Sequence, residues 1–198
     1  MSLDFFKVFD CRHISDDDME KLRSFTVRKG GGFLADYLSH DTADGKVVSP
    51  ALYDEEMHNA RVYLVIDKET DELAGYFALK TGYIAVHPSR RLFTKEFDTV
   101  PGVELANFAV NDSYIQAHGE QKGLGASIFK YCVLPIARDA QDYVGIRFIY
   151  IFALPDEGLI KRYQNYGFTR LNRLQEKSTH KLIRPRYDRG CSFMYQTL

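Results

Sequence analysis

The sequence predicts an α/β (α+β) fold with a mixed, mostly antiparallel sheet that contains one parallel pair of strands. Two observations lead to this prediction. Two apolar runs, 63–67 and 73–80, flank a short acidic turn and have the pattern of a hairpin. After residue 100, apolar strands at 103–110 and 146–154 are separated by a helical pattern, which predicts a parallel pair. A final extended segment, 192–198, is expected to close the sheet.

The elements before the hairpin follow from alternation and capping signals. Residues Phe5–Cys11 alternate as a first strand does. Ser15 is placed to cap a helix that runs to about Val27, with acidic residues in its first turn where the helix dipole favours them. Two short helices are predicted at 33–39 and 51–59.

Prolines, glycines and apolar periodicity predict the structure of the remaining segments. Residues 81–102 contain two prolines and are expected to be irregular chain. Residues 111–119 are expected to form a loop that is longer than usual before a glycine turn. A long helix is predicted from Lys122 to about Ala140, with a kink at Pro135 because proline cannot donate a backbone hydrogen bond.

Length and composition favour an ordinary globular protein. The 198 residues, 45% hydrophobic and 27% charged, suit a single domain over 1–198. A net charge of −1 gives no overall attraction to nucleic acid or to an anionic membrane, although the segment 170–189 is basic. No apolar run reaches membrane-spanning length, and no signal peptide is evident. Three widely spaced cysteines suit a reducing compartment, so a cytoplasmic location is expected.

The strand 104–110 is followed by a turn with two glycines, Gly123 and Gly125, and then by a helical pattern. Glycines allow close approach of the backbone, and the first N–H groups of a helix point toward an anion, so this arrangement predicts binding of a pyrophosphate group. The spacing excludes a P-loop, because no lysine follows the glycines in the required pattern. It also excludes the dinucleotide triplet, because Ile128 stands where the third glycine would be.

A second motif follows the strand 147–154. Asp156 is predicted to cap a short helix from Gly158 to Tyr166, which ends at Gly167 in the run Tyr-Gln-Asn-Tyr-Gly-Phe. Together the two motifs resemble the GNAT superfamily of acetyl-CoA-dependent N-acetyltransferases. Glu120–Gly125 matches its pyrophosphate loop, and the later run matches its tyrosine motif. The resemblance covers roughly residues 60–198.

The resemblance implies a fold in which the two parallel strands splay apart, helices cover both faces of the sheet, and the pantetheine of acetyl-CoA lies between the strands. It implies an N-acetyltransferase that uses acetyl-CoA as co-substrate and moves the acetyl group directly to a primary amine. The residues expected to bind the cofactor are Phe108, Ala109, Val110, Gln121, Lys122, Gly123, Leu124, Gly125, Ala126 and Asp156.

Two residues are expected to carry the chemistry. Tyr163, a phenol that is protonated at neutral pH, is the candidate donor to the departing thiolate. Glu104, near the start of its strand, is the candidate base, since partial burial raises the pKa of a carboxyl group. No histidine or cysteine spacing indicates a metal site, and no nucleophile motif predicts a covalent intermediate.

The acceptor remains open at this stage. It is a small-molecule or protein amine, or the amine of aminoacyl-tRNA, because residues 73–79 and 100–110 look like a toxin branch of the family. A non-catalytic acyl-CoA-binding regulatory module is a further alternative, because Glu120 and Asp156 depart from the usual loop and cap residues. The resemblance is compatible with a homodimer, and the composition gives no reason to expect membrane binding.

Overall fold

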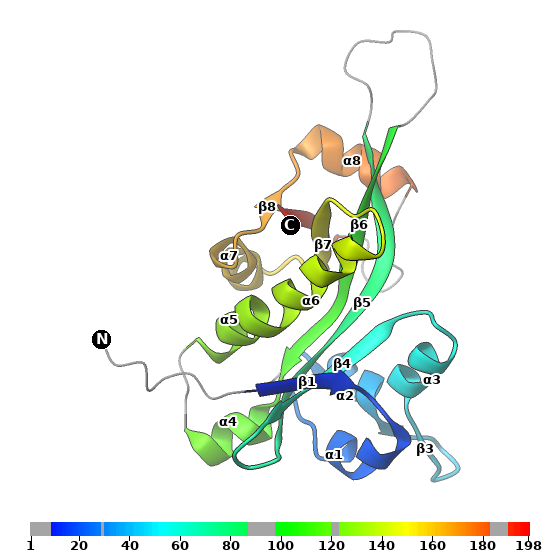
Figure 1. Cartoon of the computed structure of the whole chain (residues 1–198), viewed down its shortest axis with the longest axis vertical. Helices are drawn as coiled ribbons and strands as arrows, with labels where there is room; N and C mark the ends of the chain where they lie inside the picture. Colours follow the sequence, from blue (N-terminus) through cyan, green and yellow to red (C-terminus); the bar gives the residue numbers. More distant parts are fainter. Residues whose placement is uncertain (1–8, 29, 87–97, 120–122, 183–189) are drawn as a thin grey trace, which may run out of the picture. The chain divides into compact units, whose positions relative to one another are not determined.

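The structure is a computed structural model that describes residues 9–28, 30–86, 98–119, 123–182 and 190–198. In this part of the chain, seven strands form one sheet in the order β1-β4-β5-β6-β7-β9-β8 (Figure 1). A separate two-stranded sheet pairs β2 (His40–Asp41) with β3 (Val47–Val48).

The chain falls into two compact units. The first contains residues 1–80 and 107–133, and the second contains 81–106 and 134–198. Two long strands, β5 (Leu73–Val86) and β6 (Asp98–Val110), have residues in both units. The prediction of a single domain stays a prediction.

The first unit contains the predicted hairpin. β4 (Arg61–Asp67) pairs antiparallel with β5, from Arg61↔Leu79 to Ile66↔Leu73, with a bulge between Val65 and Ile66. β1 (Phe9–His13) pairs antiparallel with β4 along its whole length. Consecutive residues 64–67 of β4 and 73–79 of β5 are buried, so both faces of this hairpin are covered, and Leu64 and Phe77 are fully buried.

Three helical regions of the first unit lie close to their predicted positions. After Ser15 a 3₁₀ turn, η1 (Asp16–Asp18), leads into α1 (Met19–Arg23), which ends four residues before the predicted position. α2 (Gly32–Leu38) lies where the sequence placed it. α3 (Pro50–Glu56) begins at Ser49, whose hydroxyl accepts the backbone N–H of Leu52 at 3.1 Å, with Pro50 at the first helical position.

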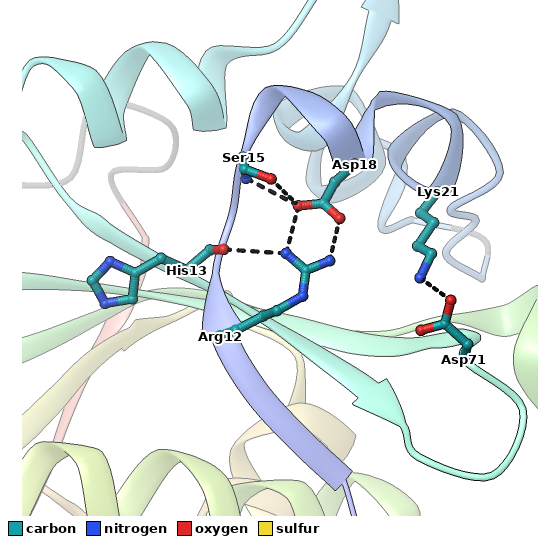
Figure 2. A network of polar contacts seen from close by, with 6 residues as sticks. All are labelled: Arg12, His13, Ser15, Asp18, Lys21 and Asp71. Atoms are coloured by element: carbon teal, nitrogen blue, oxygen red, sulfur yellow. Dashed lines mark hydrogen bonds and ion pairs between the residues drawn. The ribbon is translucent and has the colours of Figure 1, made fainter.

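An ion pair between the partly exposed Arg12 and the buried Asp18 holds the start of η1 to β1 (Figure 2). The Asp18 carboxylate, in a residue that is 2% exposed, accepts hydrogen bonds from both terminal nitrogens of Arg12 and from the backbone N–H and hydroxyl of Ser15. Burial alone would raise the pKa of Asp18, but the bonds from Arg12 and Ser15 outweigh it and hold that pKa below its usual range. A second pair, Lys21 with Asp71 at 2.7 Å, is much more exposed.

The segment 111–119 was predicted as a loop, and this was wrong: it contains α4 (Asp112–His118). Asn111 caps this helix by accepting the N–H of Ser113 at 3.2 Å. The same side chain accepts the N–H of Thr26 and donates to the carbonyl of Leu73, so a single buried amide joins three segments of the first unit.

The predicted long helix is a succession of four helical segments. α5 (Leu124–Ile128) continues into a π-helical turn, η2 (Phe129–Val133), then α6 (Leu134–Asp139) and a final 3₁₀ turn, η3 (Ala140–Asp142). The expected irregularity at Pro135 takes the form of the π turn immediately before it.

In the second unit, β6 pairs parallel with β7 (Phe148–Ala153), and β7 pairs antiparallel with β9 (Ser192–Thr197). β9 also pairs with β8 (Thr169–Arg170). Pro101 lies within β6, contrary to the expectation of irregular chain, and its carbonyl accepts the N–H of Arg147 at 3.0 Å. Proline has no N–H to donate, and Pro101 lies one residue before the ladder with β7 begins at Gly102.

Besides α6 and η3, the second unit contains α7 and α8. α7 (Glu157–Asn165) agrees with the prediction within one residue at each end. α8 (Arg173–Leu182) occupies part of the basic segment 170–189. Asn172 caps α8 by accepting the N–H groups of Leu174 and Gln175. Residues 183–189 of that segment lie outside the described part of the chain.

Candidate active site

The predicted phosphate-binding turn lies in the first unit at the start of α5. Gly123 adopts φ +89°, a left-handed conformation that favours glycine, and its carbonyl accepts the N–H of Ser127 at 2.9 Å. Leu124 is buried, whereas Gly125 and Ala126 are partly exposed. The predicted residues Gln121 and Lys122, together with Glu120, lie outside the described residues.

The end of β6 packs against this helix within the first unit. The Phe108 ring meets the edge of Phe129 in η2, with 6.4 Å between ring centroids, and Ala109 is 5% exposed. Gly75 of β5 lies opposite, where an added Cβ would come within 2.8 Å of the Ala109 carbonyl oxygen. Phe108 of β6 thus contacts η2, which continues the helix that begins at the glycine turn.

The second unit contains the parallel ladder between β6 and β7. It has three pairs, Gly102↔Phe148, Val103↔Ile149 and Glu104↔Tyr150. Within this unit β6 continues through Ala106 and β7 through Ala153, both described, but the pairing ends at Glu104↔Tyr150. The two parallel strands therefore part at the residue predicted to be the base.

Glu104 is partly buried, and its carboxylate oxygen Oε2 accepts the Tyr150 hydroxyl at 3.4 Å. Tyr150 is 2% exposed. Burial, followed by the charge of Glu104 and the hydrogen bond to it, raises the pKa of Tyr150 above its usual value, so this phenol stays protonated and acts as the donor. The sequence reasoning did not single out Tyr150, although its period-2 pattern with Phe148 and Phe152 places the three on one face.

Tyr163 lies on α7 and is 6% exposed. Its ring meets those of Tyr166 and Phe168 edge to face, with centroids 5.9 and 5.7 Å apart. Burial raises the pKa of Tyr163 above that of an ordinary phenol, so it is protonated throughout the neutral range. Glu104 and Tyr163 belong to the same unit. Glu104 is hydrogen-bonded to Tyr150, whereas Tyr163 packs against other aromatic rings of α7 and the residues that follow it.

Asp156 caps α7 as predicted, because its Oδ1 accepts the N–H of Leu159 at 2.7 Å. The helix ends at Gly167, which has φ +96°, and the N–H of Phe168 bonds back to the carbonyl of Tyr163 at 3.0 Å. The capping role of Asp156 is therefore established, and its expected contact with a cofactor stays a prediction.

Within the described residues, His, Cys, Asp and Glu side chains nowhere gather in a group of three or more suited to a metal ion. None of the helices in the described part of the chain combines the length and apolar character needed to cross a membrane.

No protein-family model matches the chain. Solved structures do resemble it. The crystal structure of AtaTR bound with AcCoA matches with a TM-score of 0.63 at 16% sequence identity, covering 96% of this chain and 93% of that chain. The structure of AtaT complexed with acetyl-methionyl-tRNAfMet matches with a TM-score of 0.59 at 16% identity, covering 94% of each chain.

A Tyr→Phe mutant of KacT also matches, with a TM-score of 0.63 at 16% identity over 96% of this chain and 94% of that chain. The chain has the GNAT fold. The predicted fold class is thereby confirmed, including the mostly antiparallel sheet and its single parallel pair. The GNAT fold also accounts for the early end of the ladder between β6 and β7.

Proposed function

We propose that the protein is an acetyl-CoA-dependent N-acetyltransferase that transfers the acetyl group directly to a primary amine. The observation that carries the proposal is the three-pair parallel ladder that ends at Glu104↔Tyr150 while both strands continue. Unpaired strand backbone offers N–H and C=O groups that an extended amide-containing chain such as pantetheine can bind. A structural neighbour, AtaTR, is bound with AcCoA.

In this proposal the first unit supplies the cofactor contacts. The backbone of Phe108, Ala109 and Val110 meets the pantetheine, and the backbone N–H groups at the start of α5, with the left-handed Gly123, meet the pyrophosphate. Gln121 and Lys122 are assigned to the same loop. Asp156, at the start of α7, is a separate cofactor contact assigned to the second unit. These contacts use main chain, so they place few demands on side-chain identity.

The reaction assigned to the second unit has balanced proton transfers. Glu104 takes a proton from the acceptor ammonium, and the resulting amine attacks the thioester carbonyl carbon. The C–S bond then breaks, the attacking nitrogen releases its second proton to solvent, and the amide product and the CoA thiolate form. Tyr163 donates a hydrogen bond to the thiolate sulfur; since its raised pKa lies above that of a thiol, stabilisation of the thiolate is favoured over full proton transfer.

The test is titration calorimetry with acetyl-CoA, followed by thiol release with a panel of primary amines. Gly123→Ala should weaken acetyl-CoA binding about tenfold, because the left-handed conformation is lost near the phosphates. Gly45→Ala is the matched control, since Gly45 also has positive φ and open space around its Cβ position. Absence of acetyl-CoA binding by the wild-type protein would refute the proposal, and binding without thiol release to any amine would favour a non-catalytic module.

Aminoacyl-tRNA is the second candidate acceptor, and one feature favours it. Arg173 and Lys177 are exposed on α8, and AtaT has been solved with acetyl-methionyl-tRNAfMet. Arg170 is less available, because it pairs with Glu176 at 3.2 Å. Salt-dependent tRNA binding that weakens in Arg173→Gln and Lys177→Gln, but not in the control Lys68→Gln, would support this acceptor. Acetylation of small amines with no tRNA binding at low salt would exclude it. The cytoplasmic location stays a prediction.

A further inference from the structure

Tyr150 and Glu104 lie on one face of the second unit's sheet. They are direct partners in the parallel ladder, and paired residues share a face. The partners of β7 across β9 extend this face: Tyr150 pairs with Tyr195, and Phe152 with Phe193. The Tyr150 ring stacks on Phe193 with centroids 5.0 Å apart and meets Phe152 edge to face at 5.8 Å.

These ring contacts fix where the Tyr150 hydroxyl can lie. With the ring held by Phe193 and Phe152, rotation about the side-chain bonds would break two aromatic contacts. The hydroxyl therefore has one direction, toward Glu104. Tyr150 is 2% exposed, so water competes little for the hydrogen bond from its hydroxyl to Glu104.

A glycine on β5 makes room for that hydroxyl. At Gly82, an added Cβ would lie 1.9 Å from the Tyr150 oxygen and 2.8 Å from the ring carbon that carries it. Any other residue at this position would have to displace the phenol. Gly82 does not have a positive φ, so the requirement is for space and not for backbone conformation.

We propose that Tyr150 is a positioning residue for Glu104: its buried hydroxyl, accommodated by Gly82, fixes the orientation of the carboxylate and keeps it ionised for the acceptor amine. The inference rests on the proposed function, in which Glu104 is the base. Tyr150 acts through Glu104 and does not contact the substrate. A donor to the charged form of a carboxyl group favours that form.

Other titratable groups face the same part of the sheet. Among the described residues these include Tyr83 on β5, whose charge would act on Tyr150, and the buried Cys191. Tyr195 on β9 packs against the same cluster, and the ring of His180 on α8 lies 6.3 Å from that of Phe152. A measurement on Glu104 must therefore separate the Tyr150 bond from these neighbours. Tyr195→Phe is the matched control, since it removes a hydroxyl from the same cluster and leaves the Tyr150–Glu104 bond in place.

The experiment is an NMR titration of the carboxyl carbons in ¹³C-glutamate-labelled protein, with Glu104→Gln used to assign the Glu104 signal. In Tyr150→Phe the titration midpoint of Glu104 should move to higher pH by about one unit, because one donor to the charged form is lost. Tyr195→Phe should leave it unchanged. Gly82→Ala, a second variant that displaces the phenol without removing it, should shift it in the same direction.

An unchanged Glu104 midpoint in both Tyr150→Phe and Gly82→Ala would overturn the inference, as would an equal shift in Tyr195→Phe. The titration needs no acceptor, so it decides the positioning role even if the wild-type protein releases no thiol from acetyl-CoA. If acetyl transfer can be measured, the acidic limb of its pH–rate profile should shift in Tyr150→Phe by as much as the Glu104 midpoint shifts in the NMR titration. The KM for acetyl-CoA should stay the same.

Discussion

Two carboxylates of this protein, Asp18 in the first unit and Glu104 in the second, are held in contrasting ways. Asp18 is almost fully buried and is bound by a guanidinium and by two donors of Ser15, as Figure 2 shows. Glu104 is partly buried and accepts a long hydrogen bond from the neutral phenol of Tyr150. The Arg12 guanidinium neutralises the negative charge of Asp18. The Tyr150 hydroxyl carries no charge and orients the Glu104 carboxylate through a hydrogen bond.

The difference separates a structural carboxylate from one suited to chemistry. A cation beside Asp18 lowers its affinity for a proton, which is what a buried structural pair needs and what a general base at neutral pH does not. A neutral donor restrains geometry with a smaller effect on proton affinity. Removing each carboxylate should therefore affect different properties, and the expected effects can be ranked.

The largest effect is expected for Glu104→Gln. If Glu104 is the base, acetyl transfer should fall by about 100-fold or more, because the amide cannot accept the ammonium proton. The amide can still accept the Tyr150 hydroxyl, so the denaturation midpoint and the KM for acetyl-CoA should change little. Steady-state kinetics with any accepted amine test this. A transfer rate within twofold of wild type would assign the base to another group.

Arg12→Met should have the next largest effect, and it should act on stability alone. Loss of the guanidinium leaves the Asp18 carboxylate buried with only Ser15 as donor, so the free energy of unfolding should fall by about 2 kcal/mol. Urea denaturation measures this. Acetyl-CoA binding by the folded fraction should stay the same, and a loss of binding without loss of stability would contradict a purely structural role.

The Arg12–Asp18 pair also predicts a pH dependence with a definite sign. The folded-state pKa of Asp18 is lowered, so its contribution to stability is fully present above its unfolded value of about 3.9. That contribution is lost as the pH falls through the folded pKa. Arg12→Met should therefore differ most from wild type at neutral pH and should approach it in acid. Urea midpoints measured between pH 7 and pH 3 provide the comparison.

Tyr163→Phe should have an intermediate effect on rate and almost none on stability. The ring contacts with Tyr166 and Phe168 do not need the hydroxyl, whereas the proposed thiolate contact does, so the rate should fall by about tenfold. Tyr166→Phe, on the next turn of the same helix end, is the control. Equal rates for wild type and Tyr163→Phe would leave the hydroxyl without a role in transfer.

The smallest effect is expected for the exposed pair of Figure 2. Lys21 and Asp71 are 2.7 Å apart, but the Asp71 side chain is 80% exposed. Lys21→Met should change the free energy of unfolding by less than about 0.5 kcal/mol, since solvent screens such a pair. A change as large as that of Arg12→Met would mean that burial does not set the strength of these pairs.

Much of the fold followed from the sequence because its signals are local. The hairpin of β4 and β5, the cap at Asp156 and the stop at Gly167 each depend on residues within one turn or one strand. α4 was missed even though Asn111 as cap, an acid in the first turn and Gly119 after the end were all visible. A helix of seven residues has too few turns for its apolar periodicity to distinguish it from a loop.

The site was less predictable, because its contacts join distant positions. Glu104 could be proposed from its strand, but its partner Tyr150 lies 46 residues away and becomes visible only through the register of the ladder. The role of Gly82 could not be inferred either, since nothing local to that residue requires a glycine. Sequence periodicity gives the face of each strand, whereas cross-strand register decides which side chains meet.

The π-helical turn at Phe129–Val133 means that the number of residues in this segment is constrained. In a regular α-helix, Pro135 would leave the carbonyl of Tyr131 without its donor and would press its ring against that carbonyl. A π turn bonds five residues apart and so absorbs an extra residue. Deleting one residue between 129 and 133 would remove the extra residue of the π turn. The proline ring would then clash with the carbonyl four residues before it. Insertions and deletions here should therefore be tolerated only together with replacement of the proline.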